Sequence, residues 1–372
     1  MRPDFQQWMA DAARLTRSGD LQAATAAIQS ALAGSLPEVA VPAHEPQPAD
    51  RWPVDRRVID VVSRELPADA PSAPVPPGPA AQPEAGPATG RFIEASHGSG
   101  PAARAYKLYI PPAAGTRPLP LVVMLHGCTQ NPDDFAAGTA MNELARAQGF
   151  FVLYPAQSQK ANPQRCWNWF KHSHQARGRG EPALLAGMTR AVMAAQAIDP
   201  ARVYVAGLSA GGAMAAILGD CYPELYAAVG VHSGLPTGAA QDLPSALGAM
   251  KSGPAPRPRA GGTTSGVPTI VFHGDADATV HPGNGEGLIA ASVPASARVN
   301  SERLQAPGGR AYTRHVHQDA PGQVVAEHWV VHGSPHAWSG GTTRGSYTDP
   351  RGPDASAEML RFFLAHPHPQ AH

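Results

Sequence analysis

The sequence predicts an α/β fold in which a mostly parallel central sheet is flanked by helices. Two observations carry this prediction. Short apolar runs recur along the chain at 121–125 (LVVML), 202–206 (RVYVA) and 268–272 (PTIVF), and such runs are typical of strands buried on both faces. The second run is followed closely by a helix-forming stretch at 212–218, which is how a parallel strand–helix unit begins.

Three parts follow one another along the chain. Residues 1–35 carry two short amphipathic patterns and predict a small helical hairpin, which is too small to fold alone and is expected to dock on the main domain or on a partner. Residues 36–90 hold 13 of the 40 prolines and predict a disordered Pro/Ala-rich linker, because this composition cannot build a core. The main domain is expected over residues 91–366.

Two features are expected inside the main domain. Residues 92–96 and 106–110 predict an opening β-hairpin. Residues 252–262 are rich in proline, glycine and arginine and predict a disordered insertion.

Composition argues against two classes of partner. The chain has 29 basic and 29 acidic residues and a pI near 7.3, so nothing suggests a nucleic acid. No apolar run approaches the ~20 residues of a membrane span.

The N-terminus lacks the charged, apolar and small-residue order of a secretory signal, which favours a cytoplasmic chain.

The most informative motif is G-L-S-A-G at 207–211, between the predicted strand 202–206 and the predicted helix. Glycines on both sides of Ser209 suit a tight strand-to-helix turn that exposes the serine hydroxyl. The following helix directs its N-terminal N–H groups and positive dipole end at whatever the serine attacks. Ser209 is therefore the expected nucleophile.

A serine nucleophile of this kind needs an acid and a base, in the chain order Ser, Asp or Glu, His. Asp277 follows the predicted strand 268–272, and His336 lies on a Gly- and Pro-bounded loop beyond the strand pattern at 328–332. We therefore expect Asp277 as the acid and His336 as the base, with Asp275 bracing its own loop instead.

The other histidines are given structural roles. Four of them lie in or near one strand pair and are expected as cross-strand or core residues: His315, His317, His328 and His332. Three more fall in a tail expected to be frayed: His366, His368 and His372.

The oxyanion hole is expected from two backbone N–H groups. Ala210 follows the nucleophile, and Cys128 lies in the loop 126–130 (HGCTQ) after the predicted strand 121–125; N–H groups at these places stabilise a tetrahedral intermediate. His126 is expected to fix this loop by hydrogen bonding rather than to act in catalysis.

Four separated motifs carry a family resemblance: 126–130 (HGCTQ), 166–170 (CWNWF), 207–214 (GLSAGGAM) and 273–277 (HGDAD). They resemble the poly(3-hydroxybutyrate) depolymerase family esterases, whose relatives include feruloyl and acetylxylan esterases. The resemblance spans about residues 90–365. It implies an α/β-hydrolase fold and a serine carboxylic-ester hydrolase in which Ser209, Asp277 and His336 form the triad.

The resemblance also implies a substrate and a location. Polyesters or oligomers of 3-hydroxybutyrate are expected, with feruloyl or acetylated sugar esters as the alternative. Many family members are extracellular, in contrast to the missing signal pattern. Three tryptophans are expected near the substrate: Trp338, Trp169 and Trp167, one of the last two being a core residue. The family commonly has a proline after the tryptophan where this chain has Ser339, which leaves the substrate contacts of that loop open.

No cofactor or metal is expected, because neither C-x-x-C nor H-E-x-x-H occurs. Whether Cys128 and Cys166 form a disulfide stays open; a bridge would favour an oxidising compartment. A serine peptidase or acyltransferase would use the same three residues, since only the acceptor that resolves the acyl-enzyme differs. A non-catalytic binding protein is the reading that the complete Ser, Asp, His order opposes.

Overall fold

A computed structural model describes residues 89–100, 103–254 and 266–369 of the chain. All of them belong to a unit that spans residues 79–372. The helical hairpin expected at 1–35 lies outside the described residues, as do nearly all of the linker expected at 36–90 and residues 255–262 of the expected insertion.

Within the described residues, ten strands form one sheet in the order β1-β2-β4-β3-β5-β6-β7-β10-β9-β8. Neighbouring strands from β4 to β10 in this order are parallel, and antiparallel pairs close both edges. The strands are β1 (Arg91–His97), β2 (Arg104–Ile110), β3 (Leu119–Leu125), β4 (Phe151–Pro155), β5 (Ile198–Leu208), β6 (Ala228–His232), β7 (Thr269–Gly274), β8 (Arg298–Gln305), β9 (Ala311–Gln318) and β10 (Val324–Val331), with β11 (Trp338–Ser339) and β12 (Thr348–Asp349) as a separate pair. The mostly parallel sheet and the opening hairpin are therefore as predicted.

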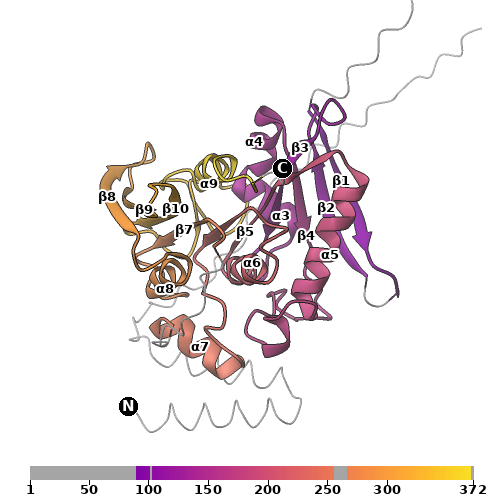
Figure 1. Ribbon diagram of the computed structural model, residues 1–372. Helices are drawn as coiled ribbons and strands as arrows, with labels where there is room; N and C mark the ends of the chain where they lie inside the picture. The colour runs from indigo at the N-terminus through magenta and orange to yellow at the C-terminus, as the bar shows by residue number, and fades with distance from the viewer. Residues whose placement is uncertain (1–88, 101–102, 255–265, 370–372) are drawn as a thin grey trace, which may run out of the picture. The chain divides into compact units, whose positions relative to one another are not determined.

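Helices cover both faces of this sheet, as Figure 1 shows. They are α3 (Pro132–Thr139), α4 (Met141–Gln148), the 3₁₀ turn η2 (His172–His174), α5 (Gly180–Ala195), α6 (Ala210–Cys221), α7 (Leu243–Ser252), α8 (Gly283–Ser292) and α9 (Ala355–Leu364). Apolar residues of α5, α6 and α8 share one core, and those of α3, α4 and α9 share a second core.

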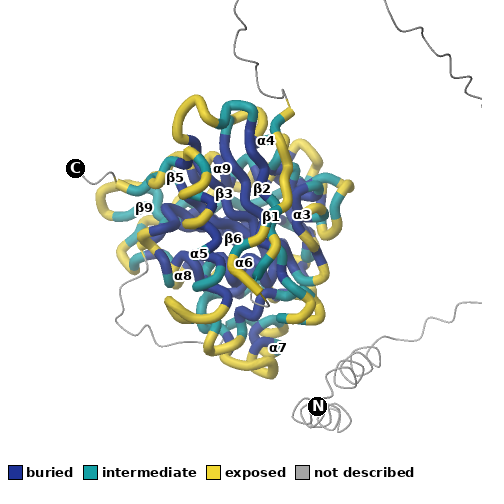
Figure 2. The backbone as a smooth tube through the Cα atoms, turned by 90° about the vertical axis from the view of Figure 1, so that its right-hand side faces the viewer, coloured by how far each residue is buried: buried dark blue, intermediate teal, exposed yellow. Residues whose placement is uncertain are grey.

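Strand β3 shows why the central runs are apolar at every position. Leu121, Val123 and Leu125 belong to the core with α5 and α6, whereas Val122 and Met124 belong to the core with α3 and α9. Successive side chains of a strand point to opposite faces, so every position of a strand covered on both sides is buried and favours an apolar residue. Figure 2 shows this buried centre in dark blue. Ligands of such sheets bind at the carboxyl ends of the strands.

The described part of the C-terminal tail is attached to the domain. The two ring nitrogens of His366 lie 2.7 Å from the carbonyl oxygens of Phe362 and Val324. The His368 N–H donates to the Ala201 carbonyl (2.8 Å). The expectation of a frayed tail is therefore wrong for these two residues, because main-chain carbonyls of α9, β10 and β5 hold them; His372 lies outside the described residues.

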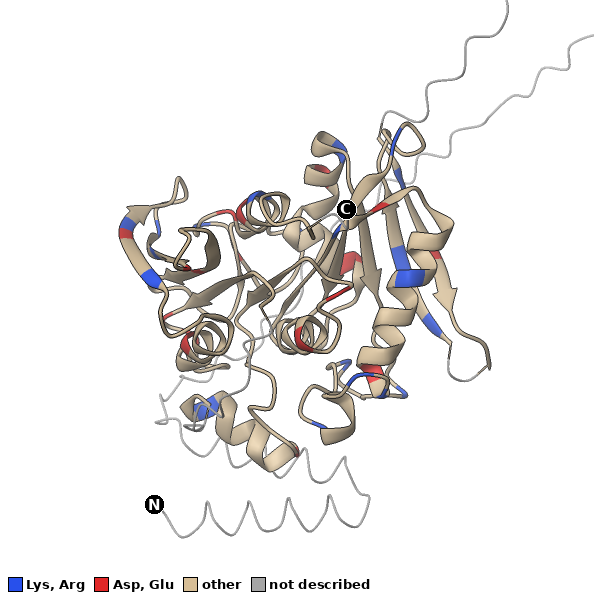
Figure 3. Cartoon of the chain, in the orientation of Figure 1, with Lys and Arg blue, Asp and Glu red and all other residues tan. Residues whose placement is uncertain are grey.

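Charged residues are spread over the helices, strands and loops that Figure 3 draws in colour, with basic and acidic side chains interspersed. This distribution agrees with the equal numbers of basic and acidic residues in the whole chain. Across the described residues, no helix has the length and apolar character needed to cross a membrane.

Candidate active site

Ser209 lies on the turn between β5 and α6. Its φ of 57° and ψ of −119° form a backbone conformation that costs a non-glycine residue about 1–3 kcal/mol. Hydrogen bonds hold the turn: the Ser209 N–H donates to the His232 carbonyl (2.9 Å), and the Ser209 carbonyl accepts from the Ala213 N–H (2.9 Å). This strained strand–turn–helix geometry is the one that presents a nucleophilic serine.

The glycines on either side of Ser209 are required by close backbone contacts. A Cβ on Gly207 would lie 2.7 Å from the Leu125 carbonyl oxygen and closer still to the backbone of Gly211. A Cβ on Gly211 would lie 2.6 Å from the His126 carbonyl oxygen and would overlap that of Leu125. The motif therefore seats the turn directly against the end of β3, which leads into the loop expected to supply the oxyanion hole.

The side chains of Asp277 and His336 meet beyond the carboxyl ends of two neighbouring strands, as the sequence predicts for an acid and a base. Asp277 follows β7, His336 follows the parallel neighbour β10, and Nδ1 of His336 lies 2.7 Å from Oδ2 of Asp277. The Asp277 side chain is buried and that of His336 is 11% exposed. Because an ionised carboxylate only accepts, Nδ1 carries the proton and Nε2 is left with its lone pair, as a general base requires.

The Asp277 carboxylate is held by several further donors. Its Oδ1 accepts from the N–H groups of Thr279 (2.9 Å) and Val280 (2.8 Å), and Nε2 of His273 lies 3.5 Å from Oδ2. Burial raises the pKa of this carboxyl, but the hydrogen bonds from His273, His336 and the Val280 backbone outweigh burial and hold the pKa well below its ordinary value. The group is therefore ionised at neutral pH, beside His336.

Asp275 makes a different set of contacts. Its Oδ1 accepts from the Gly333 N–H (2.6 Å) and its Oδ2 lies 2.8 Å from Nδ1 of His332. It therefore braces the start of the loop that carries His336, through Gly333 and His332 and not through the His336 imidazole.

His232 is a residue of the site that sequence reasoning missed. It ends β6, the strand between β5 and β7, and its Nε2 accepts from the Ser339 N–H (2.9 Å). Burial lowers the pKa of this imidazole to about 3, so it is neutral and acts as an acceptor. It therefore anchors the chain just beyond His336. Its place at the carboxyl end of a central strand was the available signal.

The loop expected to supply the oxyanion hole is built on His126. Nδ1 of this buried imidazole donates to the Gly127 carbonyl (2.7 Å), and Nε2 accepts from the Gln157 N–H (3.2 Å). Burial lowers its pKa to about 4. His126 is thus bonded within the loop, while Ala210 is the first residue of α6, whose leading N–H groups have no intrahelical partner.

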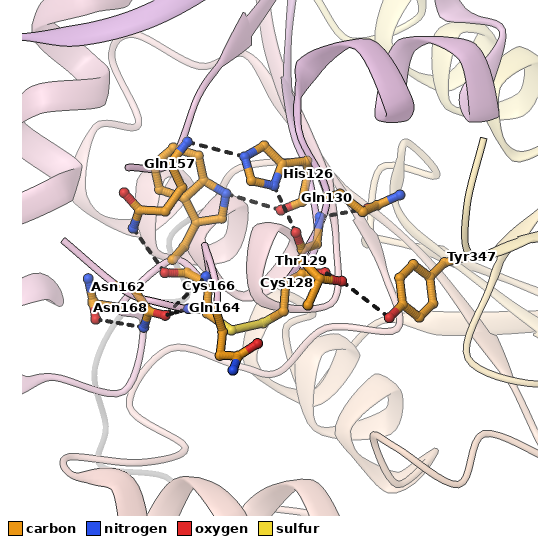
Figure 4. The surroundings of a disulfide bond; sticks show 12 residues. His126, Cys128, Thr129, Gln130, Gln157, Asn162, Gln164, Cys166, Asn168 and Tyr347 are labelled. Carbon is orange, nitrogen blue, oxygen red and sulfur yellow. Dashed lines mark hydrogen bonds between the residues drawn. A yellow bond between two sulfur atoms is a disulfide. The ribbon is translucent and has the colours of Figure 1, made fainter. Parts of the chain in front are cut away.

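Cys128 and Cys166 form a disulfide in the structure, which Figure 4 shows with its surroundings. Next to it, the Thr129 N–H donates to the Gln164 carbonyl (2.7 Å). The disulfide and this hydrogen bond join the loop 126–130 to the segment between β4 and α5. Together they fix the position of the Cys128 backbone, and with it the direction of its N–H group.

A buried carboxylate, also missed from the sequence, supports that second segment. The Glu181 oxygens accept from Nε2 of Gln157 (2.5 Å), from Nδ2 of Asn168 (2.7 Å) and from the Asn168 N–H (2.7 Å). Burial raises the pKa of Glu181, but these bonds and one to His174 prevail and lower it. Glu181 belongs to the first turn of α5, so it ties this helix to the disulfide segment.

The tryptophans expected near the substrate are core residues. Trp338 is 1% exposed, packs edge-on against Phe135 and donates its indole N–H to Ser356. Trp167 and Trp169 are 1% and 5% exposed. Trp167 donates to the His126 carbonyl (3.1 Å) and so supports the loop 126–130. The sequence predicts one of Trp167 and Trp169 in the core, and both are there. The expectation that Trp338 lines the substrate site is corrected, because its ring packs inside the second core.

The fold and the site define an α/β-hydrolase, and a solved structure agrees. The acetyl xylan esterase from Aspergillus awamori superposes with a TM-score of 0.58 at 18% identity, covering 74% of this chain and 100% of that one. A family model described as esterase PHB depolymerase matches residues 104–310, more than half of the chain. The chain belongs to this family. Ser209 and Asp277 fall inside the matched segment and His336 lies beyond it.

Relatives of the chain include polyhydroxyalkanoate depolymerases and a probable acetylxylan esterase. The chain is 37% identical to poly(3-hydroxyalkanoate) depolymerase C from Paucimonas lemoignei, over 44% of this chain and 42% of the relative. It is 30% identical to poly(3-hydroxybutyrate) depolymerase from Ralstonia pickettii, over 60% and 48%. It is 29% identical to the probable acetylxylan esterase A of Aspergillus fumigatus, over 50% and 54%. The chain thus spans about half the length of these relatives.

Proposed function

We propose that this protein is a serine carboxylic-ester hydrolase that works through an acyl-enzyme. The observation that carries the proposal is the hydrogen bond of 2.7 Å between His336 and the buried Asp277. The two residues follow β7 and β10, at the same carboxyl edge of the parallel strands as the strained Ser209 turn after β5. The hydrogen bond orients the imidazole so that Nε2 is the proton acceptor. Membership of the esterase family supports the same reaction class.

The reaction then follows from the chemistry of these groups. His336 takes the Ser209 proton as the hydroxyl oxygen attacks the ester carbonyl, and the N–H groups of Cys128 and Ala210 stabilise the resulting oxyanion. The C–O bond to the alcohol breaks as His336 protonates the leaving oxygen. Water, deprotonated by the same imidazole, then hydrolyses the acyl-enzyme and restores Ser209. Asp277 stays ionised throughout and stabilises the imidazolium.

The proposed substrates are polyesters or oligomers of short 3-hydroxyalkanoates, because relatives named as polyhydroxyalkanoate depolymerases match at 37% and 30% identity. Acetylated xylan is the second candidate, favoured by the 29% identical relative. Release of 3-hydroxybutyrate from its oligomers, measured beside release of acetate from acetylated xylan, separates the two.

The experiment that tests the reaction class is hydrolysis of p-nitrophenyl butyrate together with labelling by a fluorophosphonate. We expect the wild-type protein to hydrolyse the ester and to be labelled at Ser209, and Ser209→Ala to do neither. Ser301→Ala, which changes an exposed serine on β8, is the matched control and should behave like wild type. A wild-type protein that is neither labelled nor active would refute the proposal.

For residues 1–90 we propose a role outside the reaction, as a docking element for an insoluble polymer. The triad and its supporting residues all lie beyond residue 120, so a protein shortened to begin at residue 88 should hydrolyse small soluble esters at the wild-type rate. Its binding to polymer granules should fall. Unchanged binding together with a melting temperature lowered by many degrees would show that the segment stabilises the main domain instead.

A further inference from the structure

Tyr347 is a large aromatic side chain left in solvent on an unfavourable backbone. It is 47% exposed and has a φ of 51°. Glycine adopts positive φ without cost, whereas a bulky residue there is uncommon and is held by its surroundings. The contacts of the Tyr347 side chain explain why a tyrosine is found at this position.

The backbone of Tyr347 is attached to the loop that carries His336. Its carbonyl accepts from the Trp338 N–H (2.7 Å), and the next residue, Thr348, pairs with Trp338 in the β11–β12 pair. On the other side, the Ser346 N–H donates to Oδ1 of Asp134 (2.8 Å). Tyr347 is therefore held on both sides: its own carbonyl is bonded to Trp338, and the preceding residue, Ser346, is bonded to Asp134.

The side chain reaches the loop expected to supply the oxyanion hole. The phenol oxygen of Tyr347 lies 3.3 Å from Oγ1 of Thr129, and Figure 4 shows the ring extending toward this residue. Thr129 follows Cys128, whose disulfide and neighbouring hydrogen bond fix the loop. Tyr347 therefore links two loops. Its backbone is bonded to Trp338, just beyond His336, and its hydroxyl lies beside Thr129 in the loop 126–130, which is expected to supply the oxyanion hole.

A reacting ester has to lie between these same two loops. Its carbonyl carbon must be within reach of Ser209, its oxygen must face the N–H groups of Cys128 and Ala210, and its leaving oxygen must face His336. The tryptophans of the neighbourhood are buried and offer the ester no surface. Tyr347 is exposed, and its hydroxyl lies beside Thr129, the residue after Cys128.

We propose that Tyr347 forms a wall of the substrate site and sets the preference for esters whose acyl chain extends beyond the α carbon, such as a butyryl chain or a 3-hydroxyalkanoyl chain with its alkyl group on the β carbon. This inference rests on the proposed function and deepens it. The ring supplies the apolar contact, and the hydroxyl bonded to Thr129 fixes where the ring stands. An acetyl group is too short to bury much apolar surface against the ring, whereas a butyryl or 3-hydroxybutyryl group would pack against it and bury more.

The test uses the full-length chain and the variants Tyr347→Gly and Tyr347→Phe. Glycine removes the ring but suits the positive φ, so its melting temperature should stay within a few degrees of wild type. We expect Tyr347→Gly to lose about tenfold in kcat/KM for p-nitrophenyl butyrate and for 3-hydroxybutyrate dimers, with p-nitrophenyl acetate changed by less than about twofold. Tyr347→Phe should keep most of the preference, because the ring remains. Phe92→Ala, which removes an exposed ring on β1, is the matched control and should keep the wild-type preference.

Two results would overturn the inference while leaving the ester hydrolase intact. One is an equal loss on acetate and butyrate esters in Tyr347→Gly, and the other is an unchanged preference in that variant. Fluorophosphonate labelling of Ser209 in every variant keeps these results apart from a failure of the proposed function, which would appear as a wild-type protein without labelling or hydrolysis.

Discussion

At the scale of single residues, the hydrogen bonds of the site assign one tautomer to each of its key imidazoles. Nδ1 donates to a carbonyl in His126 and to a carboxylate in His336, and Nε2 accepts from a backbone N–H in His126 and His232. Only a neutral ring can accept, so His126 and His232 serve as fixed braces. For His336 the same logic leaves Nε2 available for the Ser209 proton.

The two aspartates at the end of β7 should therefore differ sharply when changed. Asp277→Asn replaces the acceptor of the His336 proton and favours the wrong tautomer, so kcat should fall by about 10³–10⁴. Ser209→Ala and His336→Ala should cost at least as much, because the three residues act as a unit. Asp275→Asn disturbs only the bond to Gly333 and the contact with His332 and should cost less than about tenfold.

Steady-state kinetics on p-nitrophenyl butyrate measures these ratios, with circular dichroism to check that each variant is folded. The opposite ranking, with Asp275→Asn the more damaging, would assign the acid to Asp275.

At the scale of elements, the site depends on how closely the β5–α6 turn approaches the end of β3. Gly211 allows that approach, since a side chain there would overlap the carbonyls of Leu125 and His126. The same contact brings the helix N-terminus next to the loop that leads to Cys128. Packing of one turn against one strand thus places both N–H groups expected in the oxyanion hole.

Gly211→Ala should accordingly destabilise the protein by several kcal/mol, because backbone atoms must move to relieve the overlap. We expect a melting temperature lowered by about 5 °C or more, together with a loss of esterase activity. Gly248→Ala is the matched control: it lies inside α7 with no atom near the added Cβ, so it should leave stability unchanged or raise it by up to about 1 kcal/mol. Thermal melts of the two variants provide the measurement, and equal melting temperatures would contradict the packing argument.

At the scale of the whole molecule, the burial of neutral histidines makes stability depend on pH. Burial lowers the pKa of His126 to about 4 and the pKa values of His232 and His328 to about 3. The unfolded chain binds protons at these groups below about pH 6.5, so it holds more protons than the folded chain between about pH 4 and 6.5. The free energy of unfolding should therefore fall as the pH falls through this window.

Urea denaturation at pH 7, 6 and 5 measures this dependence. Each of the three imidazoles adds up to about 1.4 kcal/mol per pH unit to the slope. His328→Gln, on β10, should lower the slope by about one group's share, whereas His172→Gln changes an exposed histidine and should leave it unchanged. A free energy of unfolding that stays constant from pH 7 to 5 would show that the buried imidazoles do not govern acid stability.

The sequence by itself determined the parallel sheet, the turn around Ser209 and the expected partners Asp277 and His336. These features have local causes: strands buried on both faces need apolar residues at every position, and a turn this tight needs glycines beside the serine. The expected acid and base could be chosen because each follows a recognisable strand, and parallel strands bring their carboxyl ends to one edge.

Only the tertiary structure decided which side chains face the substrate and which are covered. Trp338 is fully buried because Phe135 of α3 and His232 of β6 pack on its ring, and neither is near it in the sequence. His232 could be noticed from its place at the carboxyl end of a central strand, but its supporting role is seen only in its bond to Ser339. Glu181 became visible as a support only through its partners, and Tyr347 only through its exposure beside Thr129. Exposure is a property of what distant segments place on a residue, and no local pattern of this chain carries that information.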